Sequence, residues 1–138
     1  MRIAVRYFSR SGRTAAVAEA IAEGAGAKAS SIGEEPRLTE YTDLLFLGGA
    51  PYANVMDKAL RAYAEMLVPE QVGAVALFST SNWSHRTLRG LREILEKKGI
   101  SVVEEECCIN ALQVQKKLPD AKAFARRIKA ACEISDGG

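Results

Sequence analysis

Cysteine and histidine are scarce in this 138-residue chain, which contains three cysteines and one histidine. His85 stands alone, and Cys107 and Cys108 are adjacent inside an apolar run, so neither a CxxC pair nor a His/Cys cluster occurs. The sequence therefore lacks the usual ligand patterns of zinc and other soft-metal sites. Three cysteines are also too few for a disulfide framework, and we expect reduced, buried thiols.

An excess of charge of one sign and long apolar runs are missing as well. The formal charge is +2, from 19 basic and 17 acidic residues spread along the chain, which gives nucleic-acid binding little support. No stretch approaches the roughly 20 apolar residues that span a bilayer, and the N-terminus lacks the apolar run and cleavage site of a signal peptide. We expect a cytoplasmic monomer or weak dimer that binds neither nucleic acid nor membrane.

The composition is that of a folded domain. Apolar residues make up 48% of the chain and charged residues 26%, proportions typical of soluble globular proteins. The length suits one hydrophobic core, so we expect a single domain over residues 1–138.

Apolar, β-rich runs alternate with segments whose apolar residues recur at helical spacing. The expected strands are Ile3–Phe8, Lys28–Ile32, Leu44–Leu47, Val75–Phe78 and Val102–Ile109. The expected helical stripes are Val17 and Ile21; Met56, Leu60, Tyr63 and Leu67; Leu88, Leu91 and Leu95; and Ala121, Phe124 and Ile128. This alternation predicts an α/β fold in three layers, with a doubly wound, five-stranded parallel sheet covered on both faces.

Some local expectations depend on single residues. Gly99 is expected just after the end of the third helix, and Pro119 in the first turn of the last one. The polar connection 33–41 is expected as turn or 3₁₀ structure. Arg6 falls inside the first, central strand, where an unpaired buried charge is costly, so it needs a carboxylate partner or an exposed strand end.

A polar loop follows the first strand directly and leads into a helix. It reads Ser9, Arg10, Ser11, Gly12, Arg13 and Thr14. A phosphate placed there would meet free backbone N–H groups, the positive end of the helix dipole and several hydroxyl donors. Taken alone, the loop is equally compatible with an ordinary turn capped by serine and threonine, with the two arginines facing solvent. It matches neither GxxxxGK(S/T) nor GxGxxG, so those ATP and NAD motifs are absent.

The segment from Tyr7 to Thr14 resembles the FMN phosphate loop of flavodoxins, written Ser/Thr-x-Ser/Thr-Gly-x-Ser/Thr, and every specified position matches. The resemblance continues through residues 48–53 and 78–83, and so covers nearly the whole chain in the right order. It implies a flavodoxin-like strand order 2-1-3-4-5 and one non-covalently bound FMN.

The resemblance also implies which residues hold the cofactor. Tyr52 and Trp83 would flank the flavin ring, while backbone groups of their loops would meet its polar edge. The alternative for both aromatics is packing on their own loops, and for His85 it is plain solvation. The implied cofactor-binding set is Ser9, Arg10, Ser11, Gly12, Arg13, Thr14, Ala50, Pro51, Tyr52, Ala53, Ser79, Thr80, Ser81, Asn82 and Trp83.

Flavodoxin-like function means electron transfer between redox partner proteins, with no catalytic side chain of the protein's own. A small FMN-dependent NAD(P)H or quinone reductase and a cofactor-free interaction domain remain as alternatives. A response-regulator receiver lacks support, because Phe8 and Ser9 stand where acidic residues are needed. A low-molecular-weight phosphatase would need a nucleophilic cysteine in the phosphate loop, which has none.

Overall fold

The computed structural model describes residues 1–51, 56–81 and 85–137. Its sheet is parallel throughout, with the strand order β2-β1-β3-β4-β5, which confirms the predicted α/β fold and topology. The strands are β1 (Ile3–Phe8), β2 (Ala29–Ser31), β3 (Thr42–Gly49), β4 (Val72–Thr80) and β5 (Cys107–Ile109).

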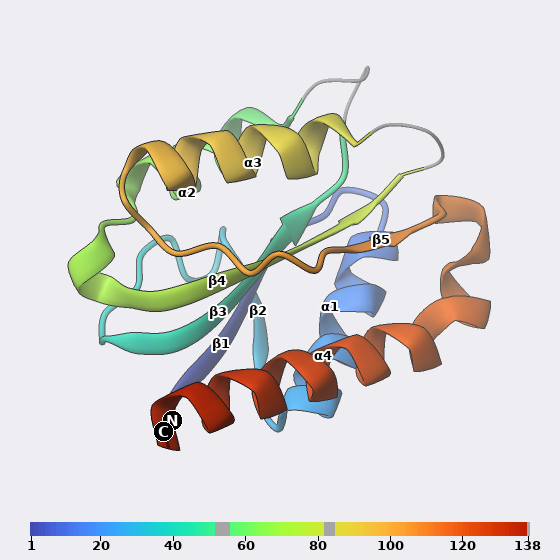
Figure 1. Cartoon of the computed structure of the whole chain (residues 1–138). Helices are drawn as coiled ribbons and strands as arrows, with labels where there is room; N and C mark the ends of the chain where they lie inside the picture. The colour runs from blue at the N-terminus through green and yellow to red at the C-terminus, as the bar shows by residue number, and fades with distance from the viewer. Residues whose placement is uncertain (52–55, 82–84, 138) are drawn as a thin grey trace.

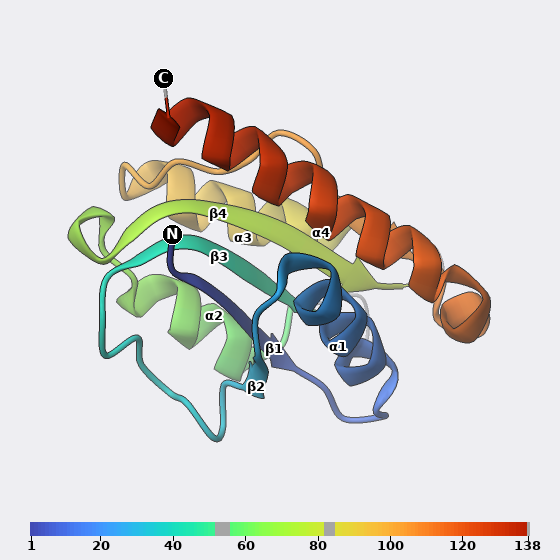
Figure 2. The ribbon, with the colours of Figure 1, turned by 90° about the horizontal axis from the view of Figure 1, so that it is seen from below.

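Helices cover both faces of this sheet. They are α1 (Arg13–Ala25), α2 (Lys58–Met66), α3 (Arg86–Lys97) and α4 (Val114–Gly137), with short 3₁₀ turns η1 (Pro69–Gln71) and η2 (Ala111–Gln113). Figures 1 and 2 show α1 and α4 on one face and α2 and α3 on the other. The predicted three-layer arrangement is therefore confirmed.

Alternation along the central strands builds one apolar core on each face. Phe46 and Phe78 point toward α1 and α4, whereas Leu47 and Leu77 point toward α2 and α3. All four side chains are fully buried. Strands covered on both faces read as continuous apolar runs, which is why these segments stood out in the sequence. The predicted helical stripes all lie in these two cores.

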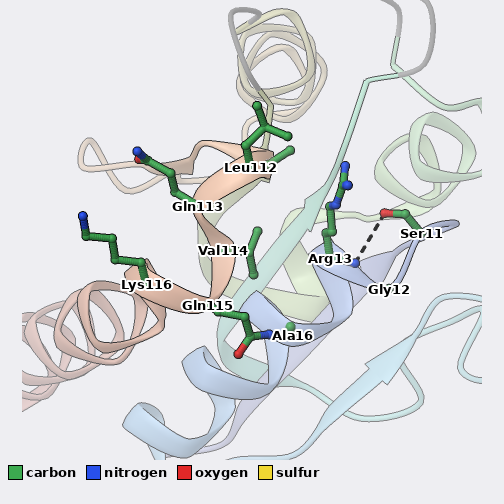
Figure 3. Close-up of a pocket in the computed structure, with 10 residues that line it drawn as sticks. Ser11, Gly12, Arg13, Ala16, Leu112, Gln113, Val114, Gln115 and Lys116 are labelled. Carbon is green, nitrogen blue, oxygen red and sulfur yellow. Dashed lines mark hydrogen bonds between the residues drawn. The ribbon is translucent and has the colours of Figure 1, made fainter.

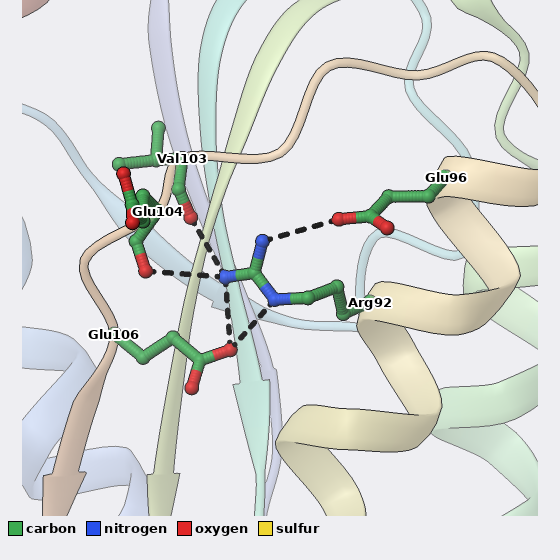
Figure 4. A network of polar contacts seen from close by, with 5 residues as sticks. All are labelled: Arg92, Glu96, Val103, Glu104 and Glu106. Carbon is green, nitrogen blue, oxygen red and sulfur yellow. Dashed lines mark hydrogen bonds and ion pairs between the residues drawn. The ribbon is translucent and has the colours of Figure 1, made fainter.

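The last strand is shorter than predicted. Only Cys107–Ile109 pairs as a strand, preceded by an isolated bridge between Val102 and Val75. In between, the Arg92 guanidinium donates to the carbonyls of Val103 and Glu104, at 2.8 and 3.3 Å, and pairs with Glu106 at 2.9 Å (Figure 4). Arg92 thus contacts the stretch that lies between this bridge and β5.

Two further expectations are wrong. Pro119 lies inside α4 and not in its first turn, because α4 begins at Val114, directly after a turn that the Asn110 side chain caps by accepting from the Leu112 N–H at 2.8 Å. Cys107 is buried but Cys108 is exposed, since successive side chains of the edge strand β5 point to opposite faces. Cys107 and Cys108 form no disulfide within the described residues. Gly99 has the left-handed φ of 80° expected of it, and the 33–41 connection contains turns.

Arg6 has neither the carboxylate partner nor the exposed strand end that the sequence predicted for it. It lies in the middle of β1, half-buried, between Ser30 of β2 and Leu47 of β3. Within the described part of the chain it forms no ion pair, and its guanidinium donates to the Val5 carbonyl at 3.0 Å.

No helix among the described residues is both long and apolar enough to cross a membrane.

Candidate functional site

The loop after β1 turns sharply at Gly12, whose φ of 86° is a left-handed conformation that glycine adopts without strain. Gly12 is also the N-cap residue of α1, and it offers no side chain to cap the helix. The first N–H groups of an α-helix have no partner inside the helix. The amino end of α1 is therefore a group of backbone donors with the positive end of the helix dipole behind it.

The two serines of this loop make local hydrogen bonds. Ser9 Oγ accepts from the Gly12 N–H at 3.1 Å, and Ser11 Oγ accepts from the Arg13 N–H at 3.4 Å (Figure 3). These are the contacts of an ordinary polar turn. Because each hydroxyl accepts in these bonds, its own proton remains to be donated to an incoming group.

Thr14 connects this loop to the end of β4. Its Oγ1 lies 2.6 Å from Oγ1 of Thr80, and the two residues are only 1% and 2% exposed. A hydroxyl has one proton and two lone pairs, so each threonine retains bonding capacity after this contact. The structure thus brings together the first and third loops that the sequence pointed to.

Asp57 belongs to this region, although the sequence argument did not include it. Its Oδ1 accepts from the Ala59 N–H at 2.8 Å as the N-cap of α2, and its Oδ2 pairs with Arg10 at 2.8 Å. The Asp57 side chain is 5% exposed, and the Arg10 guanidinium also lies 5.8 Å from the centre of the Phe8 ring. Arg10 therefore does not simply face solvent. An aspartate directly before a helical stripe is an N-cap signal that would have drawn attention to Asp57.

The end of β4 carries a buried hydroxyl without a partner. Ser79 is fully buried, and its Oγ forms no hydrogen bond in the described structure. Thr87, in the first turn of α3, is in the same condition. Leaving such a group unpaired costs about 1–3 kcal/mol. Ser81, also buried, donates its N–H to the Ile109 carbonyl at 3.0 Å.

The predicted loop at the end of β3 begins with two tightly packed glycines. A Cβ on Gly48 would collide with the Phe78 carbonyl, and one on Gly49 would come within 2.7 Å of the Leu60 side chain. Ala50 and Pro51 follow, both half-buried. The remaining predicted residues lie outside the described residues, namely Tyr52, Ala53, Asn82 and Trp83.

A pocket of about 570 Å³ adjoins the first loop. It lies between the amino end of α1 and the segment that leads into α4, where Arg13 and Lys116 supply positive charge (Figure 3). No motif in the sequence marks residues 110–116 as part of a site. Their position after the carboxyl end of β5 could have indicated a ligand-binding role, since ligands of doubly wound sheets bind at that edge. His85, at the N-cap position of α3, is exposed and makes no capping hydrogen bond.

No family model and no curated protein matches the sequence. Matches are found among solved structures. A flavodoxin from the domain Archaea superimposes with a TM-score of 0.73 at 21% identity, covering 96% of this chain and 99% of that one. Flavodoxin 2 from Bacillus cereus gives 0.69 at 20%, with 91% and 95% covered. The Flv1 flavodiiron core from Synechocystis gives 0.76 at 16%, with 98% of this chain but 36% of that one. The chain has a flavodoxin-like fold.

Proposed function

We propose that this protein binds one FMN non-covalently at the carboxyl edge of its sheet and carries electrons between redox partner proteins. The observation that carries the proposal is the amino end of α1, whose N-cap residue Gly12 has no capping side chain and which the Thr14–Thr80 hydrogen bond joins to the end of β4. The structures with the same fold that are named flavodoxins support it. When bound, FMN supplies the redox chemistry.

The residues at this edge suit a phosphate ester. Between Ser9 and Thr14 there is no acidic side chain, and the loop presents backbone N–H groups, three hydroxyls and two arginines. Such donors are the usual partners of a phosphate dianion. The described residues therefore fit the terminal phosphate of FMN.

Thr14 has a defined part in this proposal. If Thr80 donates to Thr14 within their 2.6 Å contact, the Thr14 proton points outward to a phosphate oxygen. The Thr80 hydroxyl would then donate to Thr14, and the Thr14 hydroxyl would donate to the phosphate. Mutual polarisation in such a chain strengthens both bonds.

Arg10 neutralises the Asp57 carboxylate beside the loop. An unpaired carboxylate there would repel the phosphate, and the 2.8 Å ion pair cancels that charge. In this proposal Arg10 acts on the phosphate indirectly, whereas Arg13, exposed at the start of α1, can approach it directly.

The flavin ring would lie between Tyr52 and Trp83. Backbone groups of Ala50, Tyr52, Ser79, Thr80 and Ser81 would meet its polar edge, as the resemblance to flavodoxins implies. The unpartnered hydroxyl of Ser79 supports a polar group being held near the end of β4, since an orphaned buried donor is rare in folded proteins.

A fluorescence titration tests the anchor. FMN is added to protein stripped of flavin, and quenching of flavin fluorescence gives the Kd. The double variant Ser11→Ala/Thr14→Ala should bind FMN at least tenfold more weakly, while Ser101→Ala, at an exposed position near the opposite edge, should bind as the parent does. Equal affinity of the double variant and the parent would exclude this loop as the anchor.

A second assay separates a carrier from a reductase. The FMN-loaded protein is mixed anaerobically with NADH or NADPH, and flavin absorbance is followed. A carrier should stay oxidised on the time scale of turnover and bleach only when a reductase is added. Rapid bleaching by the nicotinamide alone would replace the carrier proposal with a reductase.

A further inference from the structure

A basic residue stands in the first turn of every α-helix in the described part of the chain. Arg13, Lys58 and Arg86 are the first residues of α1, α2 and α3, and Lys116 lies in the first turn of α4. None of these first turns contains an acidic residue. All four basic side chains are exposed.

This placement is the reverse of what helix stability favours. The amino end of a helix carries the positive end of its dipole, so acidic residues stabilise it and basic residues destabilise it. Two helices are reversed at their other end as well, since Glu23 and Glu65 stand in the last turns of α1 and α2, which contain no basic residue. The folding of the helices therefore does not explain the four basic residues.

The topology gathers these residues at one edge of the sheet. Each of the four helices follows a strand of a parallel sheet, so all four begin at its carboxyl edge (Figure 1). The proposed FMN site lies at the same edge. The basic residues of four separate segments thus surround the proposed cofactor site.

Little negative charge opposes them among the described residues of this edge. Asp57 is buried, and an ion pair at 2.8 Å cancels its charge. Glu34 and Glu35 are exposed, but they follow β2, which is the edge strand on one side of the sheet. Three of the four basic residues form no ion pair within the described residues, namely Arg13, Lys58 and Lys116. Positive charge therefore dominates this edge away from β2.

Leu112 adds an apolar side chain at the same edge. It is 75% exposed, whereas every other leucine of the chain is buried or half-buried. Its N–H donates to the Asn110 side chain at 2.8 Å, and the Gln113 N–H donates to the Asn110 carbonyl at 2.9 Å, so the turn that presents Leu112 is fixed. Leu112 and Lys116 line the same pocket (Figure 3). An apolar contact next to charged groups is typical of protein–protein interfaces.

We propose that the carboxyl edge of the sheet docks an acidic electron-transfer protein. The partner's carboxylates meet the basic residues of α2, α3 and α4, and its apolar surface covers Leu112. The inference rests on the proposed function, because an electron carrier needs such a partner, and it adds the charge of that partner. Bound FMN would bring its phosphate to Arg13, which leaves the other three basic residues for docking. Transient redox complexes bury little area, so a few charges and one apolar contact are sufficient.

A titration followed by NMR tests this docking surface. The isotope-labelled, FMN-loaded protein is titrated with the soluble domain of cytochrome b5, an acidic haem protein, with both proteins oxidised so that no electron moves. At about 100 mM salt the Kd should be below about 1 mM, and about 500 mM salt should weaken binding about fivefold or more. The amide signals of residues 111–116 should shift. Cytochrome c, a basic haem protein, should bind about tenfold more weakly or less.

Two double variants with the same change in charge locate the surface. Lys58→Glu/Lys116→Glu should weaken binding of cytochrome b5 about fivefold or more at about 100 mM salt. The control Lys28→Glu/Lys97→Glu alters two exposed residues near the opposite edge, so screening should keep its Kd within about twofold of the parent's.

Urea unfolding of the same variants checks the helix argument. Lys58→Glu/Lys116→Glu removes unfavourable charges from two helix starts and should unfold at the parent's urea concentration or higher. The control should unfold at a lower concentration, because Lys97 lies favourably in the last turn of α3. Lower stability of Lys58→Glu/Lys116→Glu would mean that folding itself requires these basic residues, and would overturn the inference.

Other results would overturn it as well. These are no binding of cytochrome b5 to the FMN-loaded protein, tighter binding of cytochrome c, equal losses in the two double variants, and tighter binding of a single-stranded oligonucleotide. The titration is repeated with protein stripped of FMN, which separates the two proposals. Docking by a protein that refuses FMN would contradict the proposed function and retain the docking surface. An FMN-loaded protein that does not dock would contradict this inference alone.

Discussion

Thr14 and Thr80 share a buried hydrogen bond of 2.6 Å between residues 66 positions apart in the sequence. It joins the first turn of α1 to the last residue of β4. Two loops at the carboxyl edge of the sheet are thereby held at a fixed separation. The contact links the fold to the proposed FMN site, because Thr14 makes this buried contact and also belongs to the proposed phosphate-binding loop.

This contact predicts non-additive effects on stability. Thr14→Val and Thr80→Val each leave the other hydroxyl buried and unpaired, at a cost of about 1–3 kcal/mol. The double variant removes both hydroxyls and should be more stable than the sum of the single losses predicts. Urea unfolding of FMN-free protein measures this, and additive losses would show that the two hydroxyls do not interact.

Asp57 predicts a contrast between two substitutions. Asp57→Ala removes the N-cap of α2 and should cost about 1 kcal/mol in the free energy of unfolding. Asp57→Asn keeps a capping oxygen and should cost less, while it removes a negative charge beside the phosphate loop. FMN should bind Asp57→Asn at least as tightly as the parent. Weaker binding would mean that the carboxylate itself is needed at the site.

The buried thiol of Cys107 predicts that the stability of the folded protein depends on pH. Burial raises the pKa of Cys107 from 9.0 to about 12 in the folded protein. Below pH 9 the thiol is neutral in the folded and unfolded states alike, so its contribution to stability is fully present. As the pH rises from about 9 to about 12 the unfolded state loses its proton first, and stability falls. Urea unfolding across this range should show a shallower decline for Cys107→Ala than for the parent, and identical slopes would contradict the assignment.

Arg92 predicts a local effect on the approach to β5. It bridges α3 to Val103, Glu104 and Glu106, and a lysine cannot reproduce its planar fork of donors (Figure 4). Arg92→Lys should raise hydrogen exchange at the Val103 amide, which donates to the Val75 carbonyl at 2.8 Å. Lys117→Arg, at an ion pair elsewhere on the surface, is the matched control. Exchange as slow as in the parent would show that strand pairing alone holds this segment.

The sequence predicted features that depend on local patterns. β1 is an example, since its apolar run and the loop behind it are contiguous, and its bounds agree with the structure. The stripe of Leu88, Leu91 and Leu95 likewise needs helical periodicity alone. Polar contacts between residues far apart in the sequence could not be predicted from such local patterns. Arg92 of α3 contacts the segment before β5, and Arg10 pairs with Asp57, 47 positions away. Neither pairing leaves a periodic trace in the sequence.

The content of flavin in the purified protein tests the central claim most directly. The protein is expressed, purified and scanned for absorbance, then denatured so that released FMN can be quantified against protein. The account predicts a yellow protein with about one FMN per chain, or a colourless one that takes up added FMN to that ratio. A colourless protein that refuses added FMN would contradict it.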